Sequence, residues 1–279
     1  MTKPKKCIFP VAGCGTRFLP ITSAIPKEML PILNKPLIHY AVEEAIDSEI
    51  TNFGLIINKD KQPIRDYFSS SLNYCSKFTQ SNYELQELNN LIEKSEFSFI
   101  EQKEMLGLGH AISMAEKFLD KEESFVVILP DDLCVGKNLT VTKQLIQISN
   151  EYPSHCIIAI EEIPIEDTKK YGIISGDSLD DNNNLFHVKK LVEKPERFDS
   201  PSNLAIIGRY VLTKEIFPAL KMIHADSKGE IQLTDALNIL AMQGKVIALK
   251  FNGLRYDTGS VKGFIKANCE FAKDLGIII

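Results

Sequence analysis

The stretch VAGCGTRFLPITSAIPKEMLPILNKP runs from Val11 to Pro36 and follows a short apolar run at residues 8–12. It combines two glycines with four prolines and several basic side chains. Glycines that follow a first strand let backbone N–H groups approach an anion closely, and prolines lower the flexibility of a loop. The stretch therefore predicts a stiff, cationic loop that binds phosphate at the end of the first strand.

Two familiar phosphate-binding motifs do not fit this loop. The dinucleotide fingerprint needs a third glycine and an immediate helix, whereas Gly13 and Gly15 are followed by Phe18, Pro20 and Pro26. The Walker motif needs Gly-Lys followed by Ser or Thr, and the sequence contains no such triplet. A nucleotide would thus be held in a third way, and a purely structural glycine turn is the alternative.

The basic residues of the loop favour a ligand over a structural turn. Arg17 offers a planar, permanently charged fork for phosphate oxygens. Lys27 lies between Pro26 and Glu28, in the proline-stiffened part. Open α/β sheets bind ligands beyond the carboxyl ends of their strands, which is where this loop begins. Arg17 and Lys27 are therefore candidate phosphate-binding residues.

Composition restricts the class of protein. The chain has 279 residues and a formal net charge of −5, which argues against a broad nucleic-acid-binding face. No apolar stretch is long enough to cross a bilayer, and the six cysteines form no C-x-x-C pair. Such cysteines indicate free thiols rather than disulfides or zinc ligands. We therefore expect a cytoplasmic protein with no nucleic-acid or membrane partner.

Apolar strands alternate with helical patterns along the chain. Residues 38–46 place apolar side chains at helical spacing and predict an amphipathic helix, with Glu44 on its polar face. Further strands are predicted at 53–57, 97–102, 125–129, 155–161, 171–175, 187–193, 203–212 and 246–251. Further helices are predicted at 63–68, 83–92, 109–118, 214–222, 230–243 and 260–275.

Near-continuous apolar strands separated by helices predict an α/β fold with a mostly parallel central sheet that helices cover on both faces. The second half is richer in strands and is expected to elaborate this sheet. Residues 69–97 are polar and are interpreted as a surface insertion, and 260–279 as a C-terminal helix and tail. Because no linker is visible, residues 1–279 are expected to form one domain.

Two aspartates stand where a metal ion could bind. Asp131 ends the predicted strand 125–129, and Asp257 precedes the last helix. Carboxylates at strand ends suit Mg²⁺, which takes one or two carboxylates together with phosphates and water. Each aspartate could instead be the N-cap of a following helix. The sequence favours the two interpretations about equally.

Glu193 and Lys194 end another apolar strand. A carboxylate can accept hydrogen bonds from sugar hydroxyls, and the adjacent lysine can neutralise a phosphate. An isolated pair of this kind is otherwise a weak surface ion pair. The five histidines, His110 among them, show no metal-ligand spacing and no nucleophile partner, so none is assigned to catalysis. Cys14 is interpreted as a packing residue.

Several motifs carry a resemblance to a known family. They are Gly13-x-Gly15-Thr16-Arg17, Pro26-Lys27-Glu28-Met29-Leu30-Pro31, Gly107-Leu108-Gly109-His110-Ala111, Leu129-Pro130-Asp131, Tyr171-Gly172, Val192-Glu193-Lys194-Pro195, Ser202 to Leu212 and Glu230 to Ala236. Together they resemble bacterial UTP–glucose-1-phosphate uridylyltransferases, also called UDP-glucose pyrophosphorylases, over nearly the whole chain. The resemblance implies a Rossmann-like nucleotidyltransferase fold of the glycosyltransferase-A-like type.

The resemblance also implies roles for individual residues. The nucleotide would contact Ala12, Gly13, Gly15, Thr16, Arg17 and Lys27, and its uracil would meet Gln102 and Gly107. The sugar phosphate would contact Gly172, Glu193, Lys194 and Asn203. Mg²⁺ would bind Asp131 and Asp257, and the catalytic set would be Arg17, Lys27, Asp131 and Lys194. Asp132 stands where an apolar residue is frequent, which leaves open which of the adjacent carboxylates meets the metal.

The implied reaction converts UTP and glucose-1-phosphate into UDP-glucose and pyrophosphate, in a homodimer or homotetramer. The attacking sugar phosphate is already an anion, so no general base is required. A glucose-1-phosphate thymidylyltransferase, or an enzyme for another sugar, is the alternative, but Leu129-Pro130-Asp131 and the polar insertion favour the uridylyl interpretation. A non-catalytic subunit of the same fold is disfavoured, because the catalytic set is complete.

Overall fold

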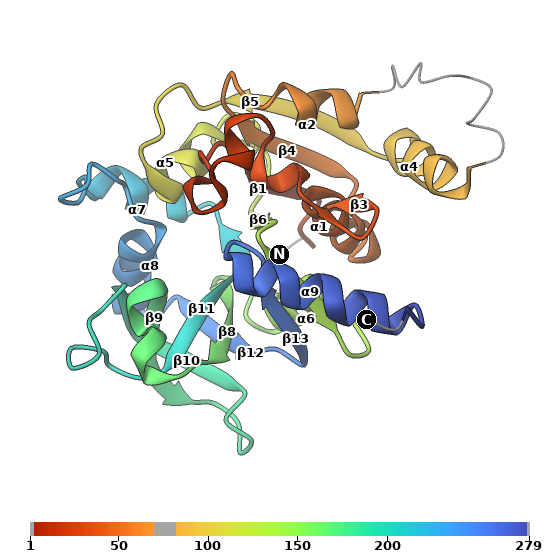
Figure 1. Cartoon of the computed structure of the whole chain (residues 1–279). Helices are drawn as coiled ribbons and strands as arrows, with labels where there is room; N and C mark the ends of the chain where they lie inside the picture. Colours follow the sequence, from red (N-terminus) through yellow and green to blue (C-terminus); the bar gives the residue numbers. More distant parts are fainter. Residues whose placement is uncertain (1–2, 70–81, 278–279) are drawn as a thin grey trace.

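The computed structural model describes residues 3–69 and 82–277, and most of its strands belong to one twisted sheet (Figure 1). Nine strands of the described chain form this sheet, in the order β5-β4-β1-β6-β11-β8-β12-β10-β9. Their bounds, in that order, are Glu96–Glu101, Asn52–Ile57, Lys6–Pro10, Ser124–Ile128, Leu204–Thr213, Cys156–Glu162, Val246–Lys250, Leu185–Glu193 and Gly172–Ser178.

The sheet is mixed, so the prediction of a mostly parallel sheet is wrong. The strands β5, β4, β1 and β6 run parallel to one another. Strand β11 enters antiparallel to both β6 and β8, and β10 is antiparallel to β9 and β12. A long apolar run shows that a strand is buried on both faces, but it does not show the strand's direction. The short turn between β9 and β10 permits only an antiparallel pair.

The helices fall close to the predicted ranges, with one addition. Their bounds are α1 Leu37–Asp47, α2 Gln62–Tyr67, α4 Tyr83–Glu93, α5 Gly107–Met114, α6 Val141–Glu151, α7 Ile216–Met222, α8 Leu233–Met242 and α9 Val261–Asp274. Helix α6 was not predicted, and neither was the antiparallel pair of β7 (Asp132–Gly136) and β13 (Gly253–Asp257). Within the described ranges, no helix has the length and apolar character that a membrane span requires.

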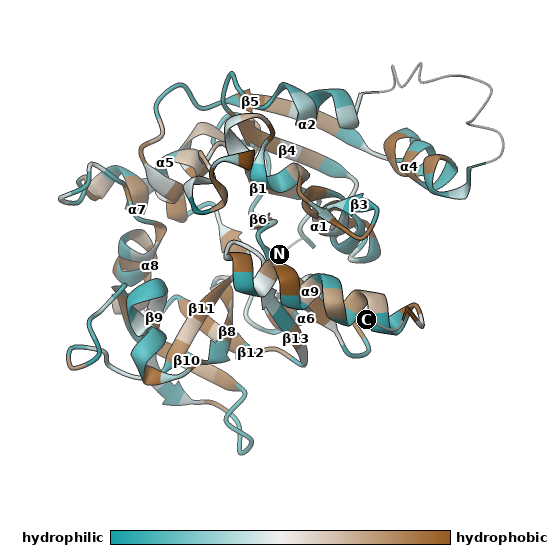
Figure 2. Ribbon diagram, viewed as in Figure 1, coloured by the Kyte–Doolittle hydropathy of each residue, from teal (hydrophilic) through white to brown (hydrophobic). Residues whose placement is uncertain are grey.

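Side chains of the sheet belong to two large hydrophobic clusters. Cys7 and Phe9 of β1 share a cluster with residues of α1 and α6, whereas Ile8 shares one with residues of α5, α7 and α8. This division follows from the alternation of side chains along a strand. In Figure 2 the strands β8 and β11 are accordingly brown along much of their length. The first part of the predicted insertion, residues 70–81, lies outside the described residues.

A third cluster joins the N-terminal loop to the last helix. Phe18 and Leu30 of the loop are buried together with Ala267 of α9, and the rings of Phe18 and Phe264 meet edge to face at 5.6 Å. The loop backbone at Leu33 donates a hydrogen bond to Asn268 Oδ1 at 3.0 Å. The loop that starts the fold is therefore held in place by α9.

Candidate active site

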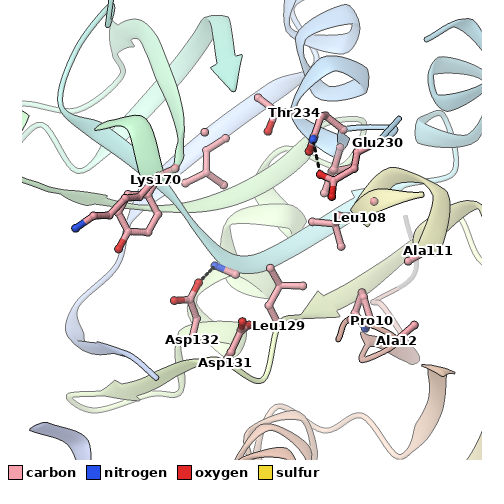
Figure 3. Close-up of a pocket in the computed structure, with 18 of the residues that line it drawn as sticks. Pro10, Ala12, Leu108, Ala111, Leu129, Asp131, Asp132, Lys170, Glu230 and Thr234 are labelled. Atoms are coloured by element: carbon pink, nitrogen blue, oxygen red, sulfur yellow. Dashed lines mark hydrogen bonds between the residues drawn. The ribbon is translucent and has the colours of Figure 1, made fainter. Parts of the chain in front are cut away.

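A cavity of about 660 Å³ opens beyond the carboxyl ends of β1 and β6 (Figure 3). Asp131 and Asp132 lie on one side of it and Thr234 and Glu230 on another. Its lining includes nearly all of the predicted site residues: Ala12, Gly13, Gly15, Thr16, Arg17, Lys27, Gln102, Gly107, Asp131, Gly172, Glu193, Lys194 and Asp257. Asn203 is not part of the lining, and its exposed side chain donates to the carbonyl of Ile163 at 3.3 Å.

The glycine loop contains no α-helix, which agrees with the prediction that its prolines exclude one. It folds into three 3-10 turns at Thr16–Phe18, Ile21–Ser23 and Lys27–Met29. Gly15 has a φ of +66°, and a Cβ there would lie 3.0 Å from Lys27 Cβ. A glycine at this position therefore allows both the left-handed backbone and the close passage of the lysine stem.

Gly13 and Cys14 are exposed and line the cavity. A Cβ at Gly13 would meet no protein atom within 4 Å. The interpretation of Cys14 as a packing residue is wrong, because this side chain is exposed and lines the cavity, with Sγ 3.4 Å from Met105 Sδ. Both positions leave room above the loop for a ligand.

Lys27 and Asp131 form an ion pair across the cavity floor, with Nζ 2.6 Å from Oδ2. Burial alone would lower the pKa of Lys27, but the carboxylates of Asp131 and Glu28 raise it above its usual value. Burial would likewise raise the pKa of Asp131, and the ammonium of Lys27 holds it below its usual value. Both side chains are therefore charged at neutral pH.

Three charged groups meet around Gly259. A Cβ at that position would lie 3.1 Å from Asp131 Oδ2, 3.2 Å from Asp257 Oδ1 and 3.3 Å from Arg17 Nη1. Arg17 Nη1 also lies 3.5 Å from the carbonyl of Gly259, to which it donates. Three segments that are distant in sequence, namely the first loop, the β6–β7 turn and the β13–α9 turn, thus bring one guanidinium and two carboxylates together.

The alternative N-cap interpretation fails for both aspartates. Asp131 is followed by strand β7 and not by a helix. Helix α9 is capped by Ser260, whose side chain accepts from Gly263 N at 3.1 Å, rather than by Asp257. Both carboxylates are consequently free of a capping role.

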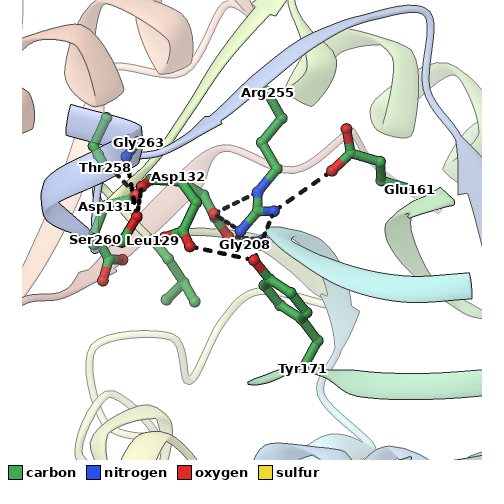
Figure 4. A network of polar contacts seen from close by, with 12 residues as sticks. Leu129, Asp131, Asp132, Glu161, Tyr171, Gly208, Arg255, Thr258, Ser260 and Gly263 are labelled. Carbon is green, nitrogen blue, oxygen red and sulfur yellow. Dashed lines mark hydrogen bonds and ion pairs between the residues drawn. The ribbon is translucent and has the colours of Figure 1, made fainter. Parts of the chain in front are cut away.

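Both carboxylate oxygens of Asp132 accept hydrogen bonds from other residues of the protein (Figure 4). Its Oδ1 accepts from Arg255 Nε at 2.6 Å, and its Oδ2 accepts from the backbone N–H of Gly208 at 2.8 Å. Arg255 was not predicted, although it lies two residues before Asp257 and therefore on the same face of β13. Tyr171, also missed, donates its hydroxyl to Asp257 Oδ2 at 3.2 Å. Both carboxylate oxygens of Asp132 are therefore engaged by Arg255 and Gly208, whereas Asp131 is paired with Lys27 through Oδ2.

Within residues 3–69 and 82–277, no three His, Cys, Asp or Glu side chains gather into a metal site of their own. Asp131 and Asp257 supply two carboxylates beside one another. This number suits a hard cation that completes its shell with phosphate oxygens and water.

The other end of the cavity carries Glu193 and Lys194. Glu193 Oε2 accepts from Thr234 Oγ1 at 2.6 Å, and Glu193 Oε1 lies 2.9 Å from Lys194 Nζ. Lys194 has a φ of +44°, a conformation that costs energy for a non-glycine residue and is concentrated at functional sites. A Cβ at Gly172 would lie 2.9 Å from Thr234 Oγ1. Thr234 lies in the motif Glu230 to Ala236, but no role was predicted for it.

Gln102 and Gly107 form part of another wall of the cavity. Gly107 has a φ of +90°, and a Cβ there would lie 2.9 Å from the carbonyl of Ile231. The backbone N–H of Ile231 donates to Leu106 O at 2.7 Å, so this loop is tied to the segment before α8. The side chain of Gln102 is buried, and its Nε2 lies 2.9 Å from His110 Nδ1.

Comparison with known proteins identifies the family to which this chain belongs. A model of the nucleotidyl transferase family matches residues 7–274. The chain is 45% identical over 266 residues to a UTP–glucose-1-phosphate uridylyltransferase of Pseudomonas aeruginosa, covering 94% of each chain. It is 42% identical over 279 residues to the enzyme of that name from Staphylococcus epidermidis, covering 98% of this chain and 93% of the relative.

Solved structures agree with this assignment. A crystal structure of UDP-glucose pyrophosphorylase complexed with UDP-glucose superposes with a TM-score of 0.89 at 46% identity, over 97% of this chain and 99% of the other. The chain therefore belongs to the nucleotidyl transferase family and, within it, to the UTP–glucose-1-phosphate uridylyltransferases.

Proposed function

We propose that this protein transfers a uridylyl group from UTP to glucose-1-phosphate, giving UDP-glucose and pyrophosphate. One observation carries the proposal: a single cavity contains the basic glycine loop, two adjacent carboxylates and the Glu193–Lys194 pair. The volume of about 660 Å³ is within the range of small-molecule sites. The names of the similar proteins support the same reaction.

The mechanism we infer is an in-line displacement at the α-phosphorus of UTP. An oxygen of the sugar phosphate attacks, and pyrophosphate leaves on the opposite side. Because the attacking group is an anion, the main barrier is repulsion: two unit charges about 4 Å apart repel by roughly 4 kcal/mol at an effective dielectric of 20. Arg17, Lys27 and Lys194, three of the basic residues in the lining, offset this repulsion by fixed positioning.

The two ends of the cavity take different substrates in this proposal. The nucleotide contacts Arg17 and Lys27 through its phosphates, and its other contacts are with Ala12, Gly13, Gly15, Thr16, Gln102 and Gly107. The sugar phosphate contacts Gly172, Glu193 and Lys194. We leave Asn203 out of this set, because its side chain would first have to leave the carbonyl of Ile163.

Asp131 and Asp257 would hold Mg²⁺. Their Oδ atoms approach the same point above Gly259, and Asp132 is already engaged by Arg255 and Gly208. The ion, when bound, supplies positive charge to the phosphate oxygens. The chain's own part is to keep the two carboxylates adjacent, and the ammonium of Lys27 holds the pKa of Asp131 below its usual value.

We further propose a single domain over residues 1–279, a cytoplasmic location and a homodimer or homotetramer. Pyrophosphate release with four nucleoside triphosphates and several sugar-1-phosphates, with and without Mg²⁺, tests the function. We expect turnover with UTP and glucose-1-phosphate that requires the metal. A preference for TTP would instead favour a thymidylyltransferase, and absence of turnover with every pair would favour a non-catalytic subunit.

A further inference from the structure

The amide of Gln102 is held in one orientation by two acceptors. The residue follows β5, and its backbone N–H donates to the carbonyl of Ile57 at 2.7 Å. Its side-chain Nε2 lies 2.9 Å from His110 Nδ1 and 3.4 Å from the carbonyl of Gly107. An amide nitrogen carries two hydrogens. Both hydrogens are thus directed at protein acceptors.

The opposite orientation of the amide is disfavoured by Gly107. A flipped amide would place Oε1 against the carbonyl oxygen of Gly107, so that two acceptors would face each other without a hydrogen. Gly107 cannot easily turn away, because its left-handed backbone lies against Ile231. The ring of His110 must then accept at Nδ1 and carry its proton on Nε2.

The amide oxygen of Gln102 is left for a ligand. In the described part of the chain, the Oε1 atom of Gln102 has no hydrogen-bond partner. This atom is also not fully buried. Gln102 is 3% exposed and lines the cavity, so the cavity is where we expect a ligand to reach this oxygen. The wall therefore presents an acceptor, and not a donor, at this point.

We propose that His110 is a positioning residue that determines which pyrimidine the cavity accepts. By accepting from Gln102, it keeps the amide oxygen directed at the ligand. Uracil and thymine carry an N–H at ring position 3, whereas cytosine carries an unprotonated nitrogen there. The oxygen of Gln102 therefore selects UTP against CTP, and it does not separate UTP from TTP. This inference rests on the proposed nucleotide site.

The test compares kcat/KM for UTP and CTP at fixed glucose-1-phosphate and Mg²⁺. His110→Leu removes the closer of the two acceptors, so that only the 3.4 Å contact with the carbonyl of Gly107 still opposes rotation of the amide. Because one hydrogen bond is exchanged for an unfavourable contact, we expect the UTP-to-CTP ratio of kcat/KM to fall about tenfold or more. His110→Asn keeps an acceptor near the position of Nδ1, so we expect it to restore most of the ratio. Ser113→Ala is the matched control.

Ser113 lies on the same helix, and its hydroxyl donates to the carbonyl of His110 at 2.7 Å. Its loss perturbs α5 without touching Gln102, so the ratio should not change. An unchanged ratio in His110→Leu, or an equal loss with Leu and Asn, would overturn the inference. If the wild-type protein uses no nucleotide with glucose-1-phosphate, the proposed function fails instead.

A second measurement needs no variant. The ¹⁵N resonances of His110 in the wild-type protein at neutral pH distinguish the two ring nitrogens. We expect Nδ1 to resonate as an unprotonated acceptor and Nε2 as protonated. A proton on Nδ1 would show that the amide oxygen faces His110, and the inference would then be wrong even if the enzyme prefers UTP.

Discussion

Gly259 shows how a single missing side chain shapes the site. Its φ is not in the left-handed region, so an alanine can adopt the same backbone. The added methyl group would nevertheless lie 3.1 Å from Asp131 Oδ2 and 3.2 Å from Asp257 Oδ1. Glycine is needed at position 259 because charged side chains lie close to it, and not because the backbone has a left-handed conformation there.

Gly259→Ala should therefore separate activity from stability. We expect kcat to fall about tenfold, because the side chains around the new methyl group must give way by a few tenths of an ångström, and small misplacements at a reacting centre are costly. The midpoint of thermal unfolding should stay close to that of the wild type. Steady-state kinetics over a Mg²⁺ titration, together with differential scanning fluorimetry, would measure both. Wild-type kcat in this variant would argue against carboxylates that must meet at this point.

Lys194 should act on the sugar phosphate. Removal of a charged hydrogen-bond donor costs about 1.5–3 kcal/mol, so Lys194→Ala should raise KM for glucose-1-phosphate about tenfold or more and change KM for UTP less. Lys189→Ala is a suitable control, since Lys189 lies on the same strand, pairs with Asp177 at 2.5 Å and is not part of the cavity lining. Equal effects on both substrates would contradict the assignment.

At the scale of elements, a buried ion pair ties α1 to β11. Arg209 is 1% exposed, and its Nη2 lies 2.7 Å from Glu44 Oε2. Its Nη1 donates to the carbonyl of Leu129 at 3.1 Å, just before the turn that carries Asp131. Glu44 was predicted on the polar face of α1, and it is nevertheless buried, because Arg209 supplies a buried partner.

Arg209→Met should reduce the free energy of unfolding by about 3–5 kcal/mol, because it leaves a buried carboxylate without its partner. The double variant Arg209→Met, Glu44→Leu should recover much of this loss. Recovery should be incomplete, since Thr142 N and Oγ1 also donate to Glu44, at 3.0 Å and 2.7 Å. Urea denaturation of the three proteins tests this. A double variant no more stable than Arg209→Met would show that the uncompensated charge is not the cause.

The elements were largely predictable, but their partners were not. Periodicity located α1 and the strand that leads to Asp131, because both signals are local. The strand β7 escaped prediction because its partner β13 lies more than a hundred residues away, with Asp132 opposite Asp257. For the same reason the sequence did not show which of Asp131 and Asp132 would bind the metal. Arg255, which donates a hydrogen bond to Asp132, lies 123 residues away in the sequence.

At the scale of the whole molecule, the site is an assembly of remote segments. Lys27 meets Asp131 across 104 residues, and Arg17 meets Gly259 across 242. Sequence motifs could predict these site residues one at a time, because binding and catalytic residues often lie in loops and at strand ends. Their mutual distances depend on the complete fold, which is why Thr234 and Tyr171 were missed.

UTP should stabilise this assembly as a unit. A ligand at a hundred times its Kd adds about 2.7 kcal/mol to the free energy of unfolding, which should raise the unfolding midpoint by about 5 °C. If Asp131 and Asp257 hold the metal, EDTA should reduce the shift, and Asp257→Asn should make the shift insensitive to EDTA. Thermal scans with UTP, Mg²⁺ and EDTA would measure this. A full shift in wild-type protein with EDTA would contradict a metal that bridges the carboxylates and the nucleotide.

The contact between Phe18 and Phe264 has a consequence for biosynthesis. A nascent polypeptide emerges with its amino-terminal part first, so the glycine loop leaves the ribosome long before the helix that clamps it. Until Asp257 and α9 follow, the loop lacks both its clamp and the second carboxylate. A polypeptide made from a messenger RNA that is truncated before codon 257 would therefore contain the recognisable phosphate-binding loop. It would not bind the nucleotide in competition with the complete protein.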